Sequence, residues 1–137
     1  MKNTALRRTL GTFVALGALG AGVLVTAAPA SAASKDGHLD YNEFSLNWED
    51  TQGGAWTDFQ YDESLLNNDR FVTPGPGSGA VVDNNSESYF NFGSRTWYVY
   101  TGAEAKGVEG WIPADLMGNF STTFKNQVSS IYNNDAN

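Results

Sequence analysis

The acidic and basic side chains offer few combinations that could catalyse a reaction. The only histidine, His38, is expected in a loose terminal segment and is therefore a poor base for a nucleophile, and one histidine without any cysteine cannot build a usual zinc site. The carboxylate pairs Glu49-Asp50 and Asp62-Glu63 could imitate the dyad of a glycoside hydrolase, but adjacent residues of a strand point to opposite sides. We therefore predict that the protein is not an enzyme and has no catalytic residue.

Tryptophan side chains offer a second kind of chemistry, because exposed indole rings can stack on sugars. The chain has Trp48, Trp56, Trp97 and Trp111. Packing in a hydrophobic core explains most such residues more simply than a binding platform does. We therefore rank a carbohydrate-binding module third among the functions that the sequence suggests.

The amino-terminal residues have the pattern of a secretory signal peptide. Lys2, Arg7 and Arg8 give a positive start, the apolar run from Leu10 to Val25 follows, and Ala30-Ser31-Ala32 has the small residues of a cleavage site. The run falls short of the roughly 20 strongly apolar residues that a membrane-spanning helix needs. We predict that residues 1–32 are a cleaved signal peptide and that the mature protein is secreted and extracellular, with no membrane contact after cleavage.

Residues 33–137 have the length of a single small domain. The full chain has a net charge of −7, and loss of Lys2, Arg7 and Arg8 makes the mature part more acidic still. Nucleic acid is a poor partner for such a surface. Without disulfides, the 4 Trp, the 6 Tyr and the Phe residues other than Phe13 of the predicted signal peptide must supply most of the core. We expect a monomer that requires no cofactor.

Short runs of alternating apolar and polar residues predict an all-β domain. Phe44–Trp48 and Ala55–Tyr61 alternate on either side of the turn signal Gln52-Gly53-Gly54 and predict a hairpin. Further strands are expected at Gly79–Val82, Thr96–Tyr100, Gly110–Ile112 and Ser129–Tyr132. One helical turn is expected at Asp62–Leu66, and loose ends at residues 34–40 and 133–137.

The mature chain contains two related halves. Gly54 in the first half matches Gly107 in the second, and each half ends on a similar polar string. We call Asn84–Tyr89 the first closing string and Lys125–Ser130 the second closing string. The first half is longer, and the glycine-rich stretch Thr73–Gly79 accounts for much of the excess.

These halves resemble the βγ-crystallin class, which pairs Greek-key motifs that close on Asn/Asp-Asn/Asp-x-x-Ser/Thr-Ser. In the first closing string the pattern is carried by Asn84, Asn85 and Ser88, and in the second by Asn126, Ser129 and Ser130, with Lys125 at the first position. The motif openings are degenerate and keep chiefly their glycines. The resemblance implies a βγ-crystallin-like sandwich of two Greek-key motifs.

The same strings are candidate calcium loops, because Ca²⁺ takes about 6–8 oxygen ligands and Asn, Ser and backbone carbonyls supply them. Asn84, Asn85 and Ser88 are the better candidates, completed by an acidic residue of an opposing hairpin: Glu49, Asp50, Glu104 or Glu109. Asn126 and Ser129 are weaker candidates, because Lys125 brings a positive charge to their string. Such Asn and Ser residues also make turn hydrogen bonds without any metal. A calcium-binding structural module without inhibitory activity is therefore the alternative function.

More narrowly, residues 42–132 resemble peptidase inhibitor family 36, the secreted actinobacterial proteins typified by the Streptomyces metalloproteinase inhibitor. The matching features are Asn42–Leu46, Gln52-Gly53-Gly54, an aromatic-rich strand through Phe59, Gly77-Ser78-Gly79 before Ala80-Val81-Val82, and Asn84-Asn85. Many members carry cysteine where Ser45 stands. The resemblance implies inhibition of an extracellular metallo- or serine peptidase.

Inhibition by such a domain requires an exposed segment that is held stiff, so that ordering it on binding costs little. The first candidate is Thr73–Gly79, which consists of Thr73, Pro74, Gly75, Pro76, Gly77, Ser78 and Gly79. Its prolines restrict φ and are compatible with an extended form, but its glycines loosen the chain, so a flexible spacer is an equal alternative to an inhibitory loop. The second candidate is the hairpin loop Thr101–Gly110.

Overall fold

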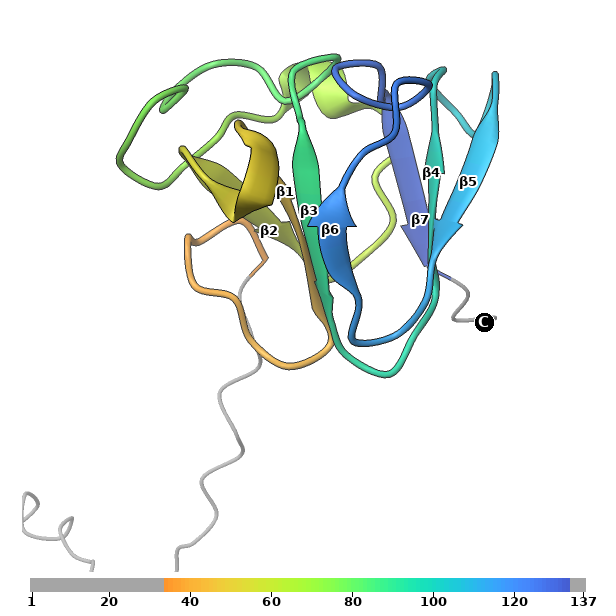
Figure 1. The fold of residues 1–137 in the computed structure, drawn as a ribbon, viewed down its shortest axis with the longest axis horizontal. Coiled ribbons are helices and arrows are strands. Elements are labelled where there is room, and N and C mark those ends of the chain that lie inside the picture. Colours follow the sequence, from red (N-terminus) through yellow and green to blue (C-terminus); the bar gives the residue numbers. More distant parts are fainter. Residues whose placement is uncertain (1–33, 134–137) are drawn as a thin grey trace, which may run out of the picture. The chain divides into compact units, whose positions relative to one another are not determined.

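Two antiparallel sheets form the part of the chain that the computed structural model describes, residues 34–133 (Figure 1). These residues belong to one compact unit that spans Ala32 to Asn137. The predicted signal peptide lies outside the described residues, as do residues 134–137. No helix within 34–133 is long and apolar enough to cross a membrane.

The first sheet has four strands in the order β2-β1-β3-β6, and the second has three in the order β5-β4-β7. The bounds of the strands are β1 Glu43–Asn47, β2 Trp56–Phe59, β3 Ser88–Phe92, β4 Trp97–Tyr100, β5 Glu109–Ile112, β6 Met117–Asn119 and β7 Ser130–Asn133. Two short 3-10 turns, η2 (Asp50–Gln52) and η3 (Leu66–Asn68), lie in the connections.

Each half of the chain contributes one segment to the sheet that the other half mainly forms. Strand β6 comes from the second half and pairs with β3 of the first. In the opposite direction, Glu63 of the first half pairs with Ile131 in β7 through two backbone hydrogen bonds of 2.8 and 2.9 Å. This exchange makes a Greek-key pair, and it confirms the predicted all-β class with two Greek-key motifs.

Five of the predicted strands are present as β1, β2, β4, β5 and β7, whereas two strands were not predicted. In β3 the polar Asn91 is fully buried and the aromatic Phe90 and Phe92 are partly exposed, which reverses the usual pattern. Strand β6 is three residues long and contains a glycine.

Two local predictions were wrong. Gly79–Val82 is not a strand, because only Val81 makes an isolated bridge, to Arg70. The helical turn lies later than Asp62–Leu66, at η3.

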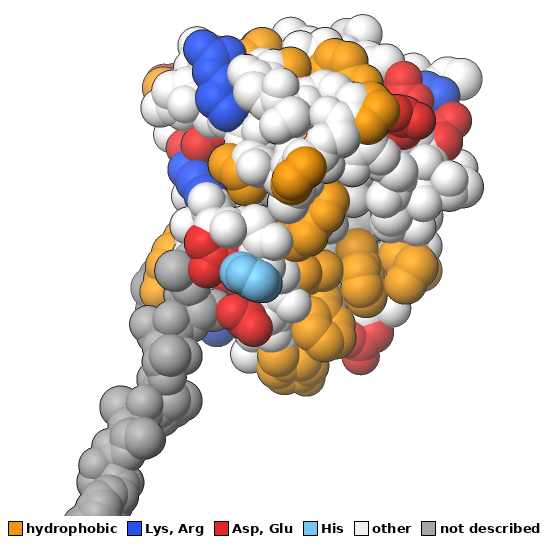
Figure 2. Space-filling model, turned by 90° about the vertical axis from the view of Figure 1, so that its left-hand side faces the viewer, with side chains coloured by type: hydrophobic (Ala, Val, Ile, Leu, Met, Phe, Trp, Pro, Cys, Tyr) orange, Lys and Arg blue, Asp and Glu red, His pale blue; other side chains and the backbone are white. Residues whose placement is uncertain are grey.

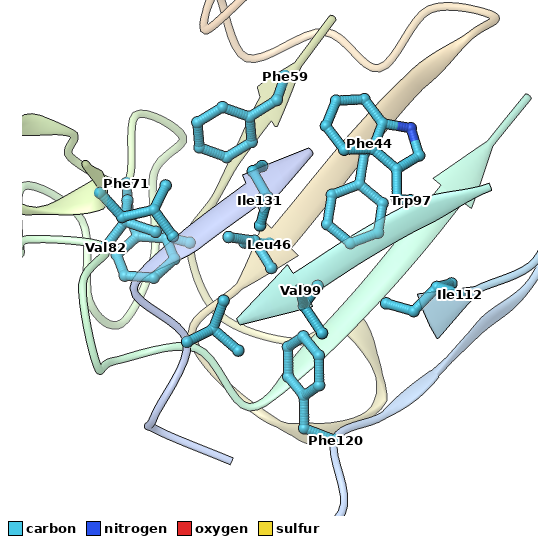
Figure 3. Close-up of a cluster of buried hydrophobic side chains, with 13 residues drawn as sticks. Phe44, Leu46, Phe59, Phe71, Val82, Trp97, Val99, Ile112, Phe120 and Ile131 are labelled. Atoms are coloured by element: carbon cyan, nitrogen blue, oxygen red, sulfur yellow. The ribbon is translucent and has the colours of Figure 1, made fainter. Parts of the chain in front are cut away.

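Aromatic and branched side chains from both sheets fill the space between them (Figure 3). Trp97 is completely buried and stacks on Phe44, with ring centroids 5.0 Å apart and planes 18° from parallel. The fully or nearly fully buried apolar residues are Phe44, Leu46, Ala55, Phe59, Leu66, Phe71, Val82, Trp97, Val99, Ile112, Phe120, Val128 and Ile131. The core thus holds the sandwich together without a disulfide.

The segment before β1 is not loose as predicted, because a buried carboxylate holds it. Both oxygens of Asp58 accept backbone N–H groups, from Lys35 at 2.5 Å, Asp36 at 3.3 Å and Gly37 at 2.8 Å. The ammonium of Lys35 makes ion pairs of 2.6 Å with Glu63 and with Asp69. Asp58 itself has no exposed surface. Residues 34–37 therefore pack against the first sheet.

Candidate functional site

Strand register sets the correspondence between the two closing strings. Asn47 in β1 faces Ser88, and its counterpart Tyr100 in β4 faces Ser130. Ser88 therefore corresponds to Ser130, not to Ser129 as the sequence repeat indicated. Asn84 then corresponds to Asn126, and both have left-handed backbones with φ of 61° and 57°. By the same register Lys125 lies just before the second motif rather than at its first position.

The two closing strings cross each other, so each one serves both halves. The N–H of Asn84 donates to Val128 at 3.0 Å, and the N–H of Asn126 donates to Ser86 at 2.8 Å. Asn84 thereby lies beside the second hairpin, while Ser88 lies beneath the first. The predicted ligand set of Asn84, Asn85 and Ser88 does not converge on one point, because the strings run past each other.

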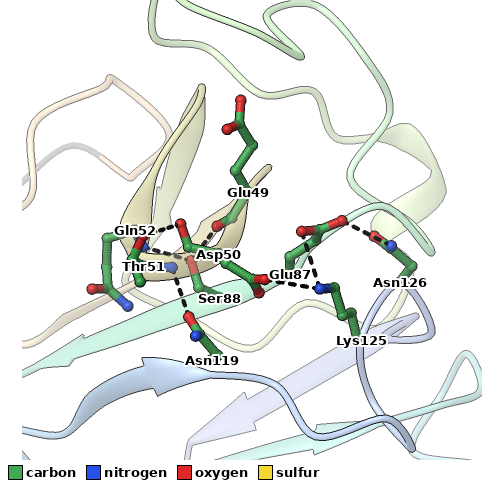
Figure 4. A network of polar contacts seen from close by, with 9 residues as sticks. All are labelled: Glu49, Asp50, Thr51, Gln52, Glu87, Ser88, Asn119, Lys125 and Asn126. Atoms are coloured by element: carbon green, nitrogen blue, oxygen red, sulfur yellow. Dashed lines mark hydrogen bonds and ion pairs between the residues drawn. The ribbon is translucent and has the colours of Figure 1, made fainter.

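The first hairpin forms one polar cluster with Ser88 at its base (Figure 4). The hydroxyl of Ser88 donates to the carbonyl of Glu49 at 2.6 Å and accepts the N–H of Gln52 at 2.9 Å. The ammonium of Lys125 lies between two carboxylates, 2.9 Å from Asp50 Oδ2 and 3.4 Å from Glu87 Oε2. The hydrogen bond to Asp50 raises the pKa of Lys125 above its usual value. We expected the charge of Lys125 to weaken calcium binding at the second closing string, but its ammonium lies beside the first hairpin instead.

The second hairpin repeats the serine contacts but not the lysine. Ser130 donates to the carbonyl of Gly102 at 2.7 Å and accepts the N–H of Ala105 at 3.1 Å. Ser129 donates to Asn84 Oδ1 at 3.3 Å, and the Asn84 amide donates to Asp83 at 3.2 Å. A cavity of about 80 Å³ beside this cluster is lined by Leu65, Leu66, Asn67, Asp83, Ala103 and Ser129.

The oxygen atoms available in the two clusters do not match a calcium site well. Ca²⁺ needs many oxygens that are free to turn toward it, and carboxylates raise its affinity. In the first cluster an ammonium already pairs with Asp50 and Glu87, and in the second Asp83 lines the cavity while Glu104 of the hairpin pairs with Lys106 at 3.3 Å. Asn85 is turned away and donates to the carbonyl of Val81 at 3.0 Å. Within residues 34–133, no group of three or more His, Cys, Asp or Glu side chains is placed to hold a metal.

The candidate inhibitory loop Thr73–Gly79 is folded into turns rather than extended. Gly75, Gly77 and Gly79 all have positive φ, at 129°, 87° and 84°. The N–H of Ser78 donates back to Gly75 at 3.0 Å, which closes one turn. The prolines therefore do not hold the loop extended, because Gly75 between them and the glycines that follow reverse the chain.

Three contacts fix this loop against the first hairpin. The N–H of Ala55 donates to the carbonyl of Pro76 at 2.8 Å, and the N–H of Trp56 donates to the Thr73 hydroxyl at 2.8 Å. The indole of Trp48 lies so close over Gly77 that a Cβ there would overlap it. Pro74, Gly75, Pro76, Ser78 and Gly79 remain exposed. The loop is thus held in place and accessible at once.

The second candidate loop, Thr101–Gly110, is a hairpin connection closed by its own backbone. The N–H of Gly102 donates to Lys106 at 2.8 Å, and the N–H of Val108 donates to the Thr101 hydroxyl at 2.8 Å. Residues 104–109 are exposed. His38 is also exposed, and Figure 2 shows the histidine on the surface between acidic side chains.

The tryptophans are divided between core and surface. Trp97 is fully buried, Trp48 and Trp56 are partly buried, and 66% of Trp111 is exposed. Cross-strand register places Trp111, Tyr98 and Tyr132 side by side on β5, β4 and β7, on the face of the second sheet that points away from the core. Sequence reasoning missed this row, because the tyrosines lie in different strands.

A tyrosine beside this row is tied to a carboxylate. Tyr100 packs edge-on against Tyr132 with ring centroids 5.7 Å apart, and its hydroxyl donates to Glu109 at 2.6 Å. That hydrogen bond raises the pKa of Tyr100 to about 12. The hydroxyl is therefore a fixed donor at neutral pH, and Glu109 keeps further acceptor capacity.

Comparison with solved structures identifies the fold as that of βγ-crystallin domains. A structure from a study of the evolution of the eye-lens βγ-crystallin domain fold matches with a TM-score of 0.56 and 10% identity, covering 75% of this chain and 89% of that one. A βγ-crystallin from Ciona intestinalis matches with a TM-score of 0.53 and 16% identity over 66% and 98% of the two chains. A domain from Flavobacterium johnsoniae gives 0.53 and 17% over 69% and 98%. No family model and no curated protein matches the sequence.

Proposed function

We propose that the protein is a secreted, non-enzymatic inhibitor of an extracellular metallo- or serine peptidase, and that Thr73–Gly79 contacts the target. The observation that carries this proposal is that the loop is exposed and yet fixed. The carbonyl of Pro76, the hydroxyl of Thr73 and the packing of Trp48 on Gly77 hold it at three points. A loop that is already ordered loses little freedom on binding, so the absence of cysteine is no obstacle.

The folded form of this loop favours occlusion of the peptidase cleft over mimicry of a substrate. An extended inhibitory strand would pair with the enzyme along its backbone, whereas the backbone here is curled through positive-φ glycines. Contact would come from the exposed Pro74 and Ser78 at the outside of the turns. A folded projection with few free backbone groups is also a poor substrate. We expect a 1:1 complex of micromolar affinity.

The proposal is tested by titrating thermolysin-like and subtilisin-like enzymes with the purified mature protein. The diagnostic variant carries Pro74→Asp and Ser78→Asp, which add charge to the outside of the loop and leave its anchoring contacts in place. A matched control carries Thr122→Asp and Thr123→Asp, on another exposed connection. Loss of inhibition in the first variant alone, with unchanged melting temperatures, is the expected result.

Two outcomes would overturn this proposal or assign the contact to another segment. If neither enzyme class is inhibited at tens of micromolar, or if the wild type is digested, the inhibitor assignment is dropped. If both variants inhibit like the wild type, the function stands but the contact lies elsewhere, and Thr101–Gly110 is the next segment to change.

A second candidate function is binding of a neutral β-linked glycan on the outer face of the second sheet. The row Trp111, Tyr98 and Tyr132 supports it, because neighbouring strands lie about 4.8 Å apart, which is close to the length of one sugar ring. Pyranose C–H groups stack on aromatic rings, while Tyr100 and Glu109 offer hydrogen bonds to hydroxyls. Strands β4, β5 and β7 contain no Lys or Arg, which disfavours an anionic ligand.

Co-sedimentation with insoluble cellulose and chitin tests this second candidate. Trp111→Ala should abolish retention on the glycan, and Tyr41→Ala, which removes a ring that is 58% exposed on the segment before β1, should not. Absence of wild-type retention on both polymers, or equal retention of the two variants, would remove the glycan hypothesis.

A further inference from the structure

The cation in the first polar cluster comes from the chain itself. Lys125 lies 75 residues after Asp50 in the sequence, yet its ammonium is 2.9 Å from the Asp50 carboxylate. A second carboxylate, Glu87, approaches it at 3.4 Å. Figure 4 shows the lysine side chain lying between these two acids, with Ser88 and the hairpin beyond them.

Further hydrogen bonds position the acids around this ammonium. The amide of Asn126 donates to the other oxygen of Glu87 at 3.2 Å. The N–H of Thr51, next to Asp50, donates to the side chain of Asn119 in β6 at 2.6 Å. Four separate segments therefore meet here: η2, the residue before β3, the end of β6 and the loop before β7.

The other half of the domain has the opposite charge at the matching position. Since Asn126 corresponds to Asn84, Lys125 corresponds to Asp83. Asp83 contacts the amide of Asn84 and lines the small cavity near the second hairpin. The two halves share their serine contacts, but the charges around them differ, because Asp50 and Glu87 also correspond to the uncharged Ala103 and Ser129.

We propose that the ammonium of Lys125 is the resident cation of the first cluster and replaces a metal ion there, so that this half of the domain folds independently of calcium. The inference concerns the stability of the scaffold and does not rest on the proposed inhibition. It explains why the first closing string keeps Ser88 and its hairpin contacts although its donors do not fit a free Ca²⁺.

A cation that is part of the chain occupies the site whatever ions the solvent contains. Lys125 is tethered to the fold, so its local concentration at the acids does not depend on the calcium content outside the cell. The hydrogen bond to Asp50 raises its pKa, so this contact does not compete with the charged form of the lysine. A calcium ion would have to displace this ammonium from Asp50 and from Glu87, and Glu87 also accepts the Asn126 amide.

The test compares melting temperatures of the wild type, Lys125→Met and Lys125→Asp in EDTA, in millimolar CaCl₂ and in NaCl of equal ionic strength. The wild type should melt at the same temperature in EDTA and in CaCl₂ once ionic strength is matched. Lys125→Met should melt lower, and the difference should shrink in high salt because ion pairs near the surface are screened. Lys125→Gln serves as a second neutral variant if the first expresses poorly.

Lys125→Asp tests whether a calcium ion can bind where the ammonium of Lys125 lies. This change adds a third carboxylate to Asp50 and Glu87, so the variant should be destabilised in EDTA and recover in calcium. We expect a dissociation constant of about 10⁻⁴–10⁻³ M, which is usual for extracellular calcium modules. Calorimetry on the same variant should detect binding heat that the wild type lacks at this site.

Each further outcome has a definite meaning. If calcium raises the wild-type melting temperature and Asp50→Asn removes the rise, calcium displaces the lysine and the proposal is wrong. If Asp83→Asn removes the rise instead, calcium binds the second half and the role of Lys125 stands. Unchanged stability of Lys125→Met and Lys125→Gln, or no calcium response in Lys125→Asp, would also overturn the proposal.

Discussion

A buried glutamate should make the domain less stable at neutral pH than at mildly acidic pH. Glu43 in β1 has no exposed surface; one of its oxygens accepts the N–H of Asp40 at 2.7 Å, and the other has no hydrogen-bond partner. Burial, with smaller contributions from Asp58, Asp40 and Asp36, raises the pKa of Glu43 to about 7. The folded protein therefore holds this proton more tightly than the unfolded chain does.

The sign and size of the effect follow from that difference. Between pH 4.5 and 7 the folded state binds more protons at Glu43, so its contribution to stability falls as pH rises and is constant above about pH 7. Each unit of pKa is about 1.4 kcal/mol. Release of the segment before β1 would admit water and limit the penalty, so we expect a loss on the order of 1–3 kcal/mol by pH 8.

Glu43→Gln removes the charge and keeps the shape of the side chain. Urea denaturation at pH 5, 6, 7 and 8 should give equal stability for wild type and variant at pH 5, with the variant more stable at pH 8. The difference between the two proteins isolates the effect of Glu43 from that of every other carboxylate, because both proteins share the others. Glu49→Gln, at an exposed position of the first hairpin, is the matched control, and its stability should fall with pH in parallel with the wild type because it retains Glu43. A variant that is equally destabilised at every pH would refute the argument.

Three further outcomes are expected. Trp97→Ala should cost about 3–5 kcal/mol in urea denaturation because a fully buried ring is lost, whereas the exposed Trp111→Ala should cost within about 0.5 kcal/mol; similar losses would contradict the placement of the two rings. Gly77→Ala should lower the melting temperature, because the new Cβ would overlap the indole of Trp48 at a φ of 87°; an unchanged value would show that the loop is not held by this contact. Intact mass of the exported protein should correspond to a chain beginning at Ala33, and retention of the first 32 residues would refute the predicted cleavage.

Most of the first hairpin was predictable because its sequence alternates, whereas β3 was not. Phe44 and Leu46 of β1 face the core and Phe59 of β2 joins them, as period-two reasoning expects. In β3 the amide nitrogen of the inward-facing Asn91 donates to the carbonyls of Arg95, Ile112 and Pro113, at 2.7, 3.0 and 2.8 Å. Two of these partners lie 21 and 22 residues away, so the buried amide leaves no periodic signal in its own strand.

The structure groups the residues of the closing strings differently from the sequence prediction. The serines and asparagines of the closing strings do lie at the hairpins, but Asn84 and Ser88 serve different halves. The repeat was read one residue out of register, because Ser129 and Ser130 are chemically alike. Only the pairing of β7 with β4 distinguishes them.

Taken alone, the sequence determined the all-β class, the division into two Greek-key halves and the reliance on an aromatic core, because burial and turn preferences act over a few neighbouring residues. The tertiary structure decided what depends on contacts distant in sequence. It folded Thr73–Gly79 back onto Trp48, aligned Trp111 with tyrosines of two other strands, and brought Lys125 to Asp50. Such encounters arise from strand register and from the exchange of segments between the sheets, and no local pattern records them.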